Sequence, residues 1–336
     1  MGEPAGIGAE VIVKALADPA IRGLARFVLF GLNEQFAYAA DLAEVNPFWW
    51  RVQAGMPIES NRDVLVVDFD ELSILGSAVR QPSKSGGEAS MRFLDEAVAA
   101  AINGQVDAIV TAAISKESWK LAGYRWPGHT EFLAWRTKSP RFAMMFAGGP
   151  IRVALATIHE PLFDVRNKFT IGCVFNPIDL LNQALRDWFG IPRPKIAVCA
   201  LNPHASESGQ FGDEEQRIIT PAITMAREAG VHVEGPFPAD TLFWRAARGE
   251  FDGVVAMYHD QGLIPIKLLA FDDSVNLTLG LPIVRTSVDH GTAFDIVGKN
   301  KARPGSMKAA IRMAAQIAKL RMSAAESQQQ KDTTNE

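Results

Sequence analysis

The sequence predicts an α/β fold with a parallel sheet. Short apolar segments alternate with helical patterns along the chain, and three of the apolar segments end abruptly in a histidine. These three segments are Val153–His159, Ile196–His204 and Val254–His259. Short apolar runs bounded by proline, glycine and polar residues are typical of buried parallel strands, whose carboxyl ends form the ligand-facing edge of an open α/β sheet. We therefore expect a histidine at the carboxyl end of each of three strands.

The three histidines, His159, His204 and His259, are candidate metal ligands. Neutral imidazole is a common ligand for divalent transition metals, and three imidazoles with an open position form a catalytic rather than a structural site. A single histidine after a strand is more often a hydrogen-bonded structural residue. The chain has only six histidines, however, and three of them follow strand patterns, which favours a metal site.

Length and composition exclude several classes of protein. With 336 residues, 48% of them hydrophobic, the chain can bury a core for two domains or one large α/β unit. The net charge of −4 and the scattered basic residues argue against a nucleic-acid partner. Cys173 and Cys199 lack metal-binding spacing, and we expect both to be buried and reduced. No apolar run reaches the ~20 residues of a membrane helix, and no signal pattern opens the chain, so we expect a cytoplasmic protein.

The chain begins with a glycine-rich segment, Met1–Gly8. Because the helical pattern of Ala9–Leu16 follows, this segment predicts a strand-to-helix turn whose backbone N–H groups face an anion or a cofactor. The strand expected in front of it is absent from this sequence, and a frayed terminal loop is the alternative. Alternating elements follow: a strand at 27–30, a helix at 34–43 and a strand at 64–68.

Residues 82–113 predict a loop, a helix and a strand in succession. The loop is Pro82–Gly87, and the helix is Glu88–Asn103, closed by Gly104. The buried strand Ala108–Ala113 comes next. Lys116, at the carboxyl end of that strand, is placed to meet a substrate.

The segment Gly128–Glu131 opens a further helix. Thr130 could cap this helix while His129 points into a cleft. For His129, a surface histidine at a helix start is the alternative.

The middle of the chain connects the three histidine segments. Residues 235–241 are expected to form a rigid loop, in which Asp240 is a candidate partner that orients a ligating histidine. Residues 260–263 resemble a turn, and His232 is interpreted as an ordinary strand residue. Two helices are predicted in this region, at 177–189 and 213–229.

Lys267, Asn276 and Arg285 bring an ammonium, an amide and a guanidinium to one region of the sequence. Together they provide the chemistry of phosphate or carboxylate capture. On a surface such a triplet is usually only solvated, which is the alternative. A polar loop at 289–298 then precedes the last helix, at 306–322.

Seven motifs carry a resemblance to a known family: Gly2–Gly8, Gly128–Glu131, Leu201–His204, Pro238–Thr241, Tyr258–Gly262, Asn276–Pro282 and Arg285–Thr292. From Gly2 to about Ala315 the chain resembles the 4-hydroxythreonine-4-phosphate dehydrogenase family of vitamin B6 biosynthesis. The resemblance implies a metal- and NAD-dependent oxidation of 4-phosphooxy-L-threonine. Decarboxylation to 3-amino-2-oxopropyl phosphate, on the route to pyridoxal 5′-phosphate, is implied as the second step.

The resemblance also implies roles for individual residues. His159, His204 and His259 match the metal ligands of the family, which are shared across the interface of a homodimer. The ion is left open among zinc, cobalt, magnesium and manganese. The general base is not identified, and Asp240 and a metal-bound water are both candidates. The substrate contacts of the family match five residues: His129, Thr130, Lys267, Asn276 and Arg285.

The implied fold is that of the isocitrate and isopropylmalate dehydrogenases, with the active site in the cleft between two α/β domains. We expect a discontinuous first domain at 1–128 and 286–322. The second domain, at 129–285, would carry the metal ligands and the dimer interface. The polar tail at 323–336 is expected to be disordered.

Dehydrogenases of this type bind NAD without the G-x-G-x-x-G fingerprint, which does not occur in this sequence. The segment 290–298 is similar to their adenosine-binding loop. We therefore expect NAD, or alternatively NADP, to contact four residues of this loop: His290, Gly291, Thr292 and Asp295.

Two other functions stay open. Paralogues in the family oxidise D-threonate or D-erythronate 4-phosphate, or an aromatic cis-diol, and the motifs do not separate these substrates. A chain with this fold could also have lost turnover and kept only metal or nucleotide binding.

Overall fold

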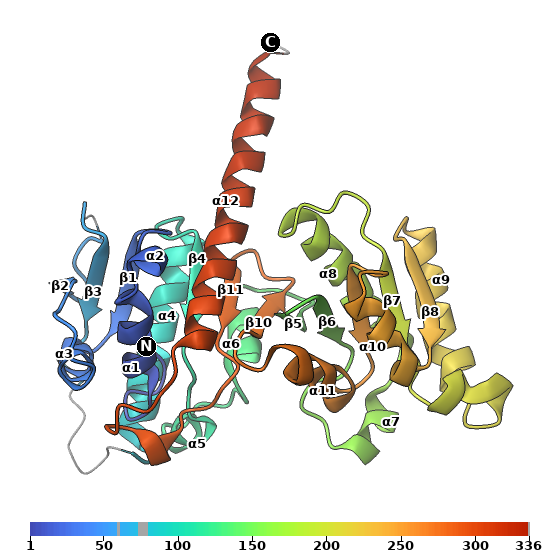
Figure 1. Ribbon diagram of the computed structural model, residues 1–336, viewed down its shortest axis with the longest axis horizontal. Helices are drawn as coiled ribbons and strands as arrows, with labels where there is room; N and C mark the ends of the chain where they lie inside the picture. The colour runs from blue at the N-terminus through green and yellow to red at the C-terminus, as the bar shows by residue number, and fades with distance from the viewer. Residues whose placement is uncertain (59–60, 73–79, 335–336) are drawn as a thin grey trace. The chain divides into compact units, whose positions relative to one another are not determined.

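The computed structural model describes residues 1–58, 61–72 and 80–334 (Figure 1). The chain divides into two compact units. Unit 1 comprises Met1–Lys138 and Pro282–Ala315, and unit 2 comprises Ser139–Leu281 and Gln316–Glu336. The chain therefore leaves unit 1 after residue 138, where a boundary at 128 was expected, and returns to it at 282, where 286 was expected.

Unit 1 contains two sets of parallel strands. Strands β1, β3 and β2 form one sheet in that order, and β4 pairs with β11. The parallel pairing confirms the predicted α/β class. The elements of unit 1 are α1 (Gly8–Leu16), α2 (Pro19–Arg22), β1 (Phe27–Gly31), α3 (Asn33–Leu42), β2 (Trp50–Gln53), β3 (Val64–Asp68), α4 (Lys84–Ile102), β4 (Ala108–Thr111), α5 (Lys116–Leu121), α6 (His129–Arg136), β11 (Val284–Ser287), the 3₁₀ turn η5 (Phe294–Ile296) and the first turns of α12 (Gly305–Thr334).

Helix α1 lies in the core of unit 1. Its apolar residues surround the helix axis, which is the pattern of a helix buried on all sides. Val11 and Val13 are fully buried and belong to one hydrophobic cluster with Phe36 of α3 and Val66 of β3. This packing fixes the glycine-rich segment that leads into α1.

Unit 2 contains a mixed sheet with the strand order β10-β5-β6-β9-β7-β8. The elements of unit 2 are β5 (Ala143–Gly148), β6 (Ile151–Leu155), the 3₁₀ turn η2 (Leu162–Asp164), α7 (Val165–Lys168), α8 (Ile171–Asp187), β7 (Ile196–Cys199), the turn η3 (Pro203–Gly209), the π-helical turn η4 (Glu215–Ile219), α9 (Thr220–Glu228), β8 (Val233–Phe237), α10 (Ala239–Ala247), β9 (Gly253–Ala256), α11 (His259–Ala270) and β10 (Val275–Leu279).

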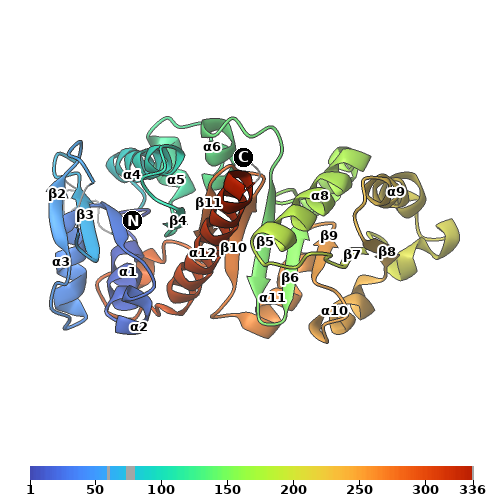
Figure 2. The ribbon, with the colours of Figure 1, turned by 90° about the horizontal axis from the view of Figure 1, so that it is seen from above.

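Three neighbouring strands of this sheet precede the three histidines. Strands β6, β9 and β7 are adjacent and parallel, and β7 and β9 are buried at every position. This confirms the expectation of buried parallel strands with a shared carboxyl edge. Figure 2 shows that helices α8 and α9 cover one face of the sheet and α10 and α11 the other, which explains why these strands are continuously apolar.

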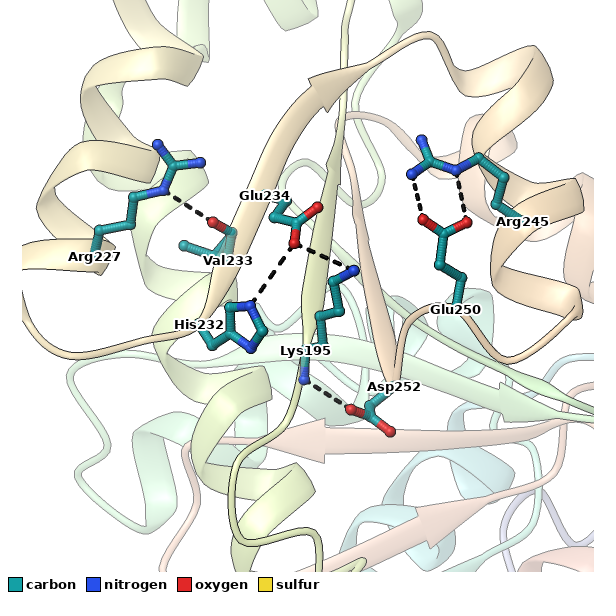
Figure 3. A network of polar contacts seen from close by, with 8 residues as sticks. All are labelled: Lys195, Arg227, His232, Val233, Glu234, Arg245, Glu250 and Asp252. Carbon is teal, nitrogen blue, oxygen red and sulfur yellow. Dashed lines mark hydrogen bonds and ion pairs between the residues drawn. The ribbon is translucent and has the colours of Figure 1, made fainter.

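The amino ends of β7, β8 and β9 are tied together by polar contacts (Figure 3). The backbone N–H of Lys195, which precedes β7, donates to Asp252 Oδ2, which precedes β9, at 2.7 Å. The Lys195 ammonium lies 3.2 Å from Glu234 Oε1 on β8. His232 lies 3.7 Å from the same carboxylate, immediately before β8. This network fixes the edge of the sheet opposite the histidines.

Two helices begin earlier than the sequence analysis expected because a side chain caps each of them. Ser83 Oγ accepts a hydrogen bond from the N–H of Gly86 at 3.0 Å, so α4 begins at Lys84 and the expected loop at 82–87 is wrong. Thr170 Oγ1 accepts from the N–H of Cys173 at 3.2 Å, so α8 begins at Ile171 rather than at 177. A capping hydroxyl satisfies a backbone donor that would otherwise end the helix.

Four further expectations about local structure need correction. Residues 260–263 are part of helix α11 rather than a turn. The expected rigid loop at 235–241 is the end of β8 followed by the start of α10. The expected helix at 213–229 is a π-helical turn followed by α9. Helix α12 continues to Thr334, so helix replaces the expected disordered tail, whose last two residues lie outside the described part of the chain.

Two expectations from composition can be compared with the structure. Cys173 and Cys199 are both free thiols, and Cys199 is buried, whereas Cys173 is partly exposed. Among the residues described, no helix is both long enough and apolar enough to cross a membrane.

Candidate functional site

The first group of candidate residues lies at the carboxyl edge of the sheet in unit 2. Beyond the ends of β6 and β9, both the N–H and the hydroxyl of Thr157 donate to the carbonyl oxygen of Met257, at 3.2 and 2.8 Å. This pairing keeps the two chain segments together after the strands end. The imidazole ring centres of His159 and His259 consequently lie 5.9 Å apart.

His259 is the first residue of helix α11 and is oriented by its neighbour. Its Nδ1 lies 2.7 Å from Asp260 Oδ1. A carboxylate only accepts, so in the neutral ring Nδ1 carries the proton and Nε2 keeps a lone pair that can ligate a metal. Asp240, the residue expected to orient a histidine, lies in the first turn of α10. Asp260 makes this contact instead.

Gln261 was not singled out by the sequence analysis. Its amide oxygen accepts from the N–H of Met257 at 2.7 Å, and its amide nitrogen donates to the carbonyl of Ala200 at 2.8 Å. Met257 follows β9 and Ala200 follows β7. One side chain therefore links the carboxyl ends of the strands that lead to His259 and His204.

His204 lies in an unusual backbone segment. It begins a run of left-handed residues that extends to Ser208, with φ between 43° and 62°. Each L-residue in this region costs about 1–2 kcal/mol, so the segment must be held by its surroundings. Ser206 is buried, and its carbonyl accepts from the N–H of Phe211 at 3.1 Å. The His204 ring packs against Phe211 with ring centres 6.1 Å apart.

The part of the chain that the structure describes does not form a complete metal site by itself. Among the described residues, no three His, Cys, Asp or Glu side chains are grouped so that they could hold a metal ion. His159 and His259 form a close pair, whereas the ring contact of His204 is with Phe211. His159 and His204 are both exposed.

The second group of candidate residues lies in unit 1, where Arg285 is buried. Its side chain is 2% exposed, and its Nε and Nη2 donate to Thr111 Oγ1 on the paired strand β4, at 3.2 and 2.7 Å. Burial lowers the pKa of the guanidinium, and the carboxylate of Glu131 acts in the opposite direction. A buried cation is costly to hold, so this position favours the binding of an anion.

His129 is the first residue of α6 and is partly buried. Its ring packs edge-on against Trp119, with ring centres 5.8 Å apart. Desolvation, followed by the positive charge of Arg285 and more weakly that of Lys116, lowers the pKa of His129 well below its ordinary value of 6.5. The imidazole is therefore neutral at pH 7, and the expected alternative of a surface histidine does not hold.

This depressed pKa makes the stability of the folded chain depend on pH. Below about pH 6.5 the unfolded state protonates His129 and the folded state does not, so the free energy of unfolding falls as the pH falls. The contribution of this one group is at most about 1.4 kcal/mol per pH unit. Urea unfolding between pH 5.5 and 7.5 should show a shallower pH dependence for His129→Gln than for the wild type. His232→Gln, at a histidine whose side chain is 58% exposed, is the matched control, and an equal change in both variants would contradict the assignment.

Thr130 does not cap helix α6, contrary to expectation. The N-cap position is Gly128, no side chain caps the helix, and Thr130 lies inside the first turn, 5% exposed. Gly128 lies close to the Lys116 side chain. A Cβ atom added at Gly128 would lie 3.8 Å from Lys116 Cε. Lys116 and Arg285 thus bring two positive charges to this end of unit 1, and both lower the pKa of His129.

Lys267 and Asn276 lie in unit 2. Lys267 is on α11, with its ammonium 5.1 Å from the ring centre of Phe271. Asn276 is on β10 opposite Phe146 of β5. The Asn276 Oδ1 atom is buried and has no hydrogen-bond partner among the described residues. A buried acceptor of this kind is rare in native structures, and a water molecule or a ligand donor can satisfy it.

The glycine-rich start of the chain and the expected cofactor loop lie side by side in unit 1. The N–H of Ile7 donates to the carbonyl of Thr292 at 3.1 Å, and a Cβ at Gly6 would lie 3.0 Å from the same oxygen. The N–H of Glu3 donates to Ala113 O at 2.9 Å, which places this segment at the carboxyl end of β4. The alternative of a frayed terminal loop is therefore wrong.

Within the expected cofactor loop, His290 Nδ1 lies 2.9 Å from the carbonyl of Gly291, so it is the donor. His290 Nε2 is then an acceptor, and it is buried without a hydrogen-bond partner among the described residues. Asp295 lies in the 3₁₀ turn η5. The loop therefore presents an unsatisfied acceptor that a bound ligand could use.

Comparison with known proteins gives consistent matches over most of the chain. The family model described as pyridoxal phosphate biosynthetic protein PdxA matches residues 24–314. The chain is 47% identical over 324 residues to 4-hydroxythreonine-4-phosphate dehydrogenase of Geobacter metallireducens, with 96% of this chain and 95% of that protein covered. It is 43% identical over 323 residues to D-threonate 4-phosphate dehydrogenase of Cupriavidus necator, with 95% and 96% covered.

A solved structure supports the same relationship. The crystal structure of 4-hydroxythreonine-4-phosphate dehydrogenase from Klebsiella pneumoniae matches with a TM-score of 0.84 and 41% identity, and 95% of this chain and 96% of that chain are covered. The fold is therefore the expected α/β fold, shared with this 4-hydroxythreonine-4-phosphate dehydrogenase.

Proposed function

Because the chain belongs to the family of the pyridoxal phosphate biosynthetic protein PdxA, we propose that it oxidises 4-phosphooxy-L-threonine with NAD. It is a dehydrogenase, an oxidoreductase acting on a CH–OH group. In the first step of the proposed reaction, the secondary alcohol transfers a hydride to NAD and releases its hydroxyl proton. The resulting β-keto acid then loses carbon dioxide to give 3-amino-2-oxopropyl phosphate. The observation that carries this proposal is the likeness to 4-hydroxythreonine-4-phosphate dehydrogenases over nearly the full length of both proteins.

Five residues are proposed to contact the substrate. The buried guanidinium of Arg285 suits an anionic group, because a phosphate or carboxylate can accept from it bidentately. Neutral His129 can donate or accept one hydrogen bond without adding charge. The orphaned Oδ1 of Asn276 suits a hydroxyl or amino donor of the substrate. Thr130 and Lys267 complete the proposed set.

A divalent metal ion is proposed to bind His159, His204 and His259, with zinc, cobalt, magnesium and manganese as the candidates. The first and third histidines fit this role, because their rings are close and Asp260 leaves Nε2 of His259 as the lone-pair nitrogen. When bound, the ion supplies a positive charge that promotes ionisation of the substrate hydroxyl and stabilises negative charge during decarboxylation. The Asp260 carboxylate orients the ligand ring.

We propose that the metal set is completed in a homodimer. The three histidines do not group within the described residues of one chain. His159 and His204 are exposed, so both could meet a second copy, and His204 of that copy is the proposed third ligand. Helix α11, which begins at His259, also presents an apolar stripe on one side. Ile264 and Leu268 of the helix and Phe271 directly after it are 66%, 83% and 64% exposed, which is unusual for a surface without a partner.

NAD is proposed to contact the loop that contains His290, Gly291, Thr292 and Asp295, with NADP as the alternative. The buried His290 Nε2 acceptor supports a ligand at this loop. The glycine-rich segment lies beside this loop, because the N–H of Ile7 donates to the carbonyl of Thr292.

Metal removal tests the proposal directly. Protein stripped of metal by a chelator should form little NADH from 4-phosphooxy-L-threonine, and added divalent ions should restore turnover. NADH formation is followed by absorbance, with D-threonate 4-phosphate and D-erythronate 4-phosphate measured in parallel under the same conditions. Turnover that is unaffected by stripping, in protein shown to be free of metal by elemental analysis, would contradict the metal assignment.

A second candidate function is a D-threonate 4-phosphate dehydrogenase. The relative of that name in Cupriavidus necator, 43% identical over nearly the whole chain, is the observation that favours it. Turnover of only the sugar-acid phosphate in the same assay would select this function. The remaining alternative substrate, an aromatic cis-diol, lacks the phosphate group. Including it in the same NADH assay would distinguish it from the phosphorylated substrates.

A further inference from the structure

We propose that Glu215 is a positioning residue that holds the loop carrying His204 in its left-handed conformation. The inference concerns the same site as the proposed function and rests on the proposed role of His204 as a metal ligand. Glu215 lies at the start of the π-helical turn η4, eleven residues after His204 in the chain. The sequence analysis gave it no role.

The Glu215 carboxylate is buried and binds the strand-to-loop junction in front of His204. The side chain is 2% exposed. Its Oε1 accepts from the backbone N–H groups of Leu201 and Asn202 at 2.8 and 2.7 Å. Its Oε2 accepts from the side-chain amide of Asn202 at 3.0 Å. A carboxylate that accepts three hydrogen bonds in a buried position makes strong, charge-assisted contacts.

These contacts lie where the backbone changes conformation. Asn202 is extended, with φ −95° and ψ 157°, and the left-handed run begins two residues later at His204. The run contains no glycine, so its residue types do not favour this conformation. By fixing both backbone donors before Pro203, Glu215 sets the direction in which the chain enters the run.

The other end of the loop closes on the same residues. Gly212 has φ +115°, and a Cβ at this position would lie 2.7 Å from Asn202 Nδ2 and 2.6 Å from Glu214 Oε2. Glu214 Oε2 itself accepts from Asn202 Nδ2 at 2.7 Å. One polar cluster, formed by Asn202, Glu214 and Glu215, therefore holds both ends of the loop from Pro203 to Gly212. The central carboxylate, that of Glu215, comes from a π-helical turn, which is rare and frequently found at functional sites.

The variant Glu215→Gln removes the charge and keeps the size of the side chain. Two measurements are made on full-length, metal-stripped protein: the affinity for Co²⁺ by calorimetry, and amide hydrogen exchange of peptides covering residues 200–212. We expect Co²⁺ binding to weaken by about 10- to 100-fold, the range found when residues that orient metal ligands are changed. We also expect faster exchange that is confined to this loop. Asp213→Asn is the matched control and should change neither quantity, because this exposed carboxylate accepts from Arg217 Nε at 3.2 Å in the neighbouring turn.

Gly212→Ala provides a second route to the same cluster and should reproduce both effects without altering any charged group. Faster exchange throughout unit 2 together with a lower Tm would identify a general structural role for Glu215 and overturn the inference. Unchanged exchange and unchanged Co²⁺ affinity in both variants would also overturn it. His204→Ala separates this inference from the proposed function: if that variant binds Co²⁺ normally, the ligand assignment fails, whereas the exchange measurement still reports whether Glu215 holds the loop.

Discussion

Replacing Arg285 by methionine is expected to lower kcat/KM for the phosphorylated substrate by about 10²- to 10³-fold, a loss of about 3–4 kcal/mol in transition-state binding. The guanidinium is buried and donates to the hydroxyl of Thr111, and it is the proposed contact for an anionic group of the substrate. Methionine has a similar length and no charge. Because a buried charge is costly to hold, the same variant should keep or raise the Tm.

The combination of lower activity and undiminished stability separates a binding role from a structural one. If Arg285 served only to hold β4 and β11 together, the methionine variant would lose stability and retain its kinetic constants once folded. Arg92→Met is the matched control. Arg92 pairs with Glu96 on the surface of α4 at 3.2 Å, with a side chain 58% exposed, and its replacement should affect neither kcat/KM nor Tm.

Replacing Gly87 by alanine is expected to destabilise the protein by about 1–3 kcal/mol, the range for inserting a methyl group into a packed interface. Helix propensity alone predicts the opposite, a gain of about 0.5–1 kcal/mol for this change in a helix interior. The packing term prevails because α4 and α5 approach closely here. A Cβ at Gly87 would lie 2.1 Å from the carbonyl oxygen of Ser118, a backbone atom that cannot move aside without shifting α5.

Urea unfolding with a matched glycine tests this prediction. Gly172 in α8 is exposed, and a Cβ there meets no atom within 4 Å. Gly172→Ala should therefore stabilise the protein slightly, so the two variants should differ in sign. A stabilised Gly87→Ala variant would mean that α4 and α5 are free to separate.

The positions of strands along the chain could be predicted where burial alone decides them. The expected strand at 64–68 is β3 (Val64–Asp68), whose residues are all buried. The three apolar runs before the histidines are also parallel strands of one sheet, as expected, and the structure adds that they are neighbours. Continuous burial leaves a continuous apolar signal in the sequence, and this signal is strong enough to identify the element.

Helix starts and loop conformations could not be predicted to the same degree. The start of α4 depends on one hydroxyl, that of Ser83, within a segment whose glycines suggest a loop. The left-handed run after His204 contains no glycine or asparagine that would reveal it. Its conformation depends on Glu215, which acts through backbone groups rather than through a pattern in the sequence.

Candidate site residues were identifiable by type, but their partners were not. Thr111 and Arg285 are 174 residues apart, and no local pattern connects a threonine at a strand end to a distant arginine. The orienting carboxylate was expected at Asp240, whereas the contact to His259 is made by the adjacent Asp260. Chemistry can be inferred from residue types, while pairing depends on the completed fold.

The pairing of β4 with β11 also has a consequence for protein synthesis. Strand β4 ends at Thr111, and its parallel partner begins only at Val284. The continuous stretch Ser139–Leu281 of unit 2 is translated entirely within this interval. On the ribosome, the nascent β4 therefore keeps an open edge until the inserted unit has been made. Because domains generally fold as units during translation, unit 1 cannot complete its fold until this long stretch of unit 2 has been made.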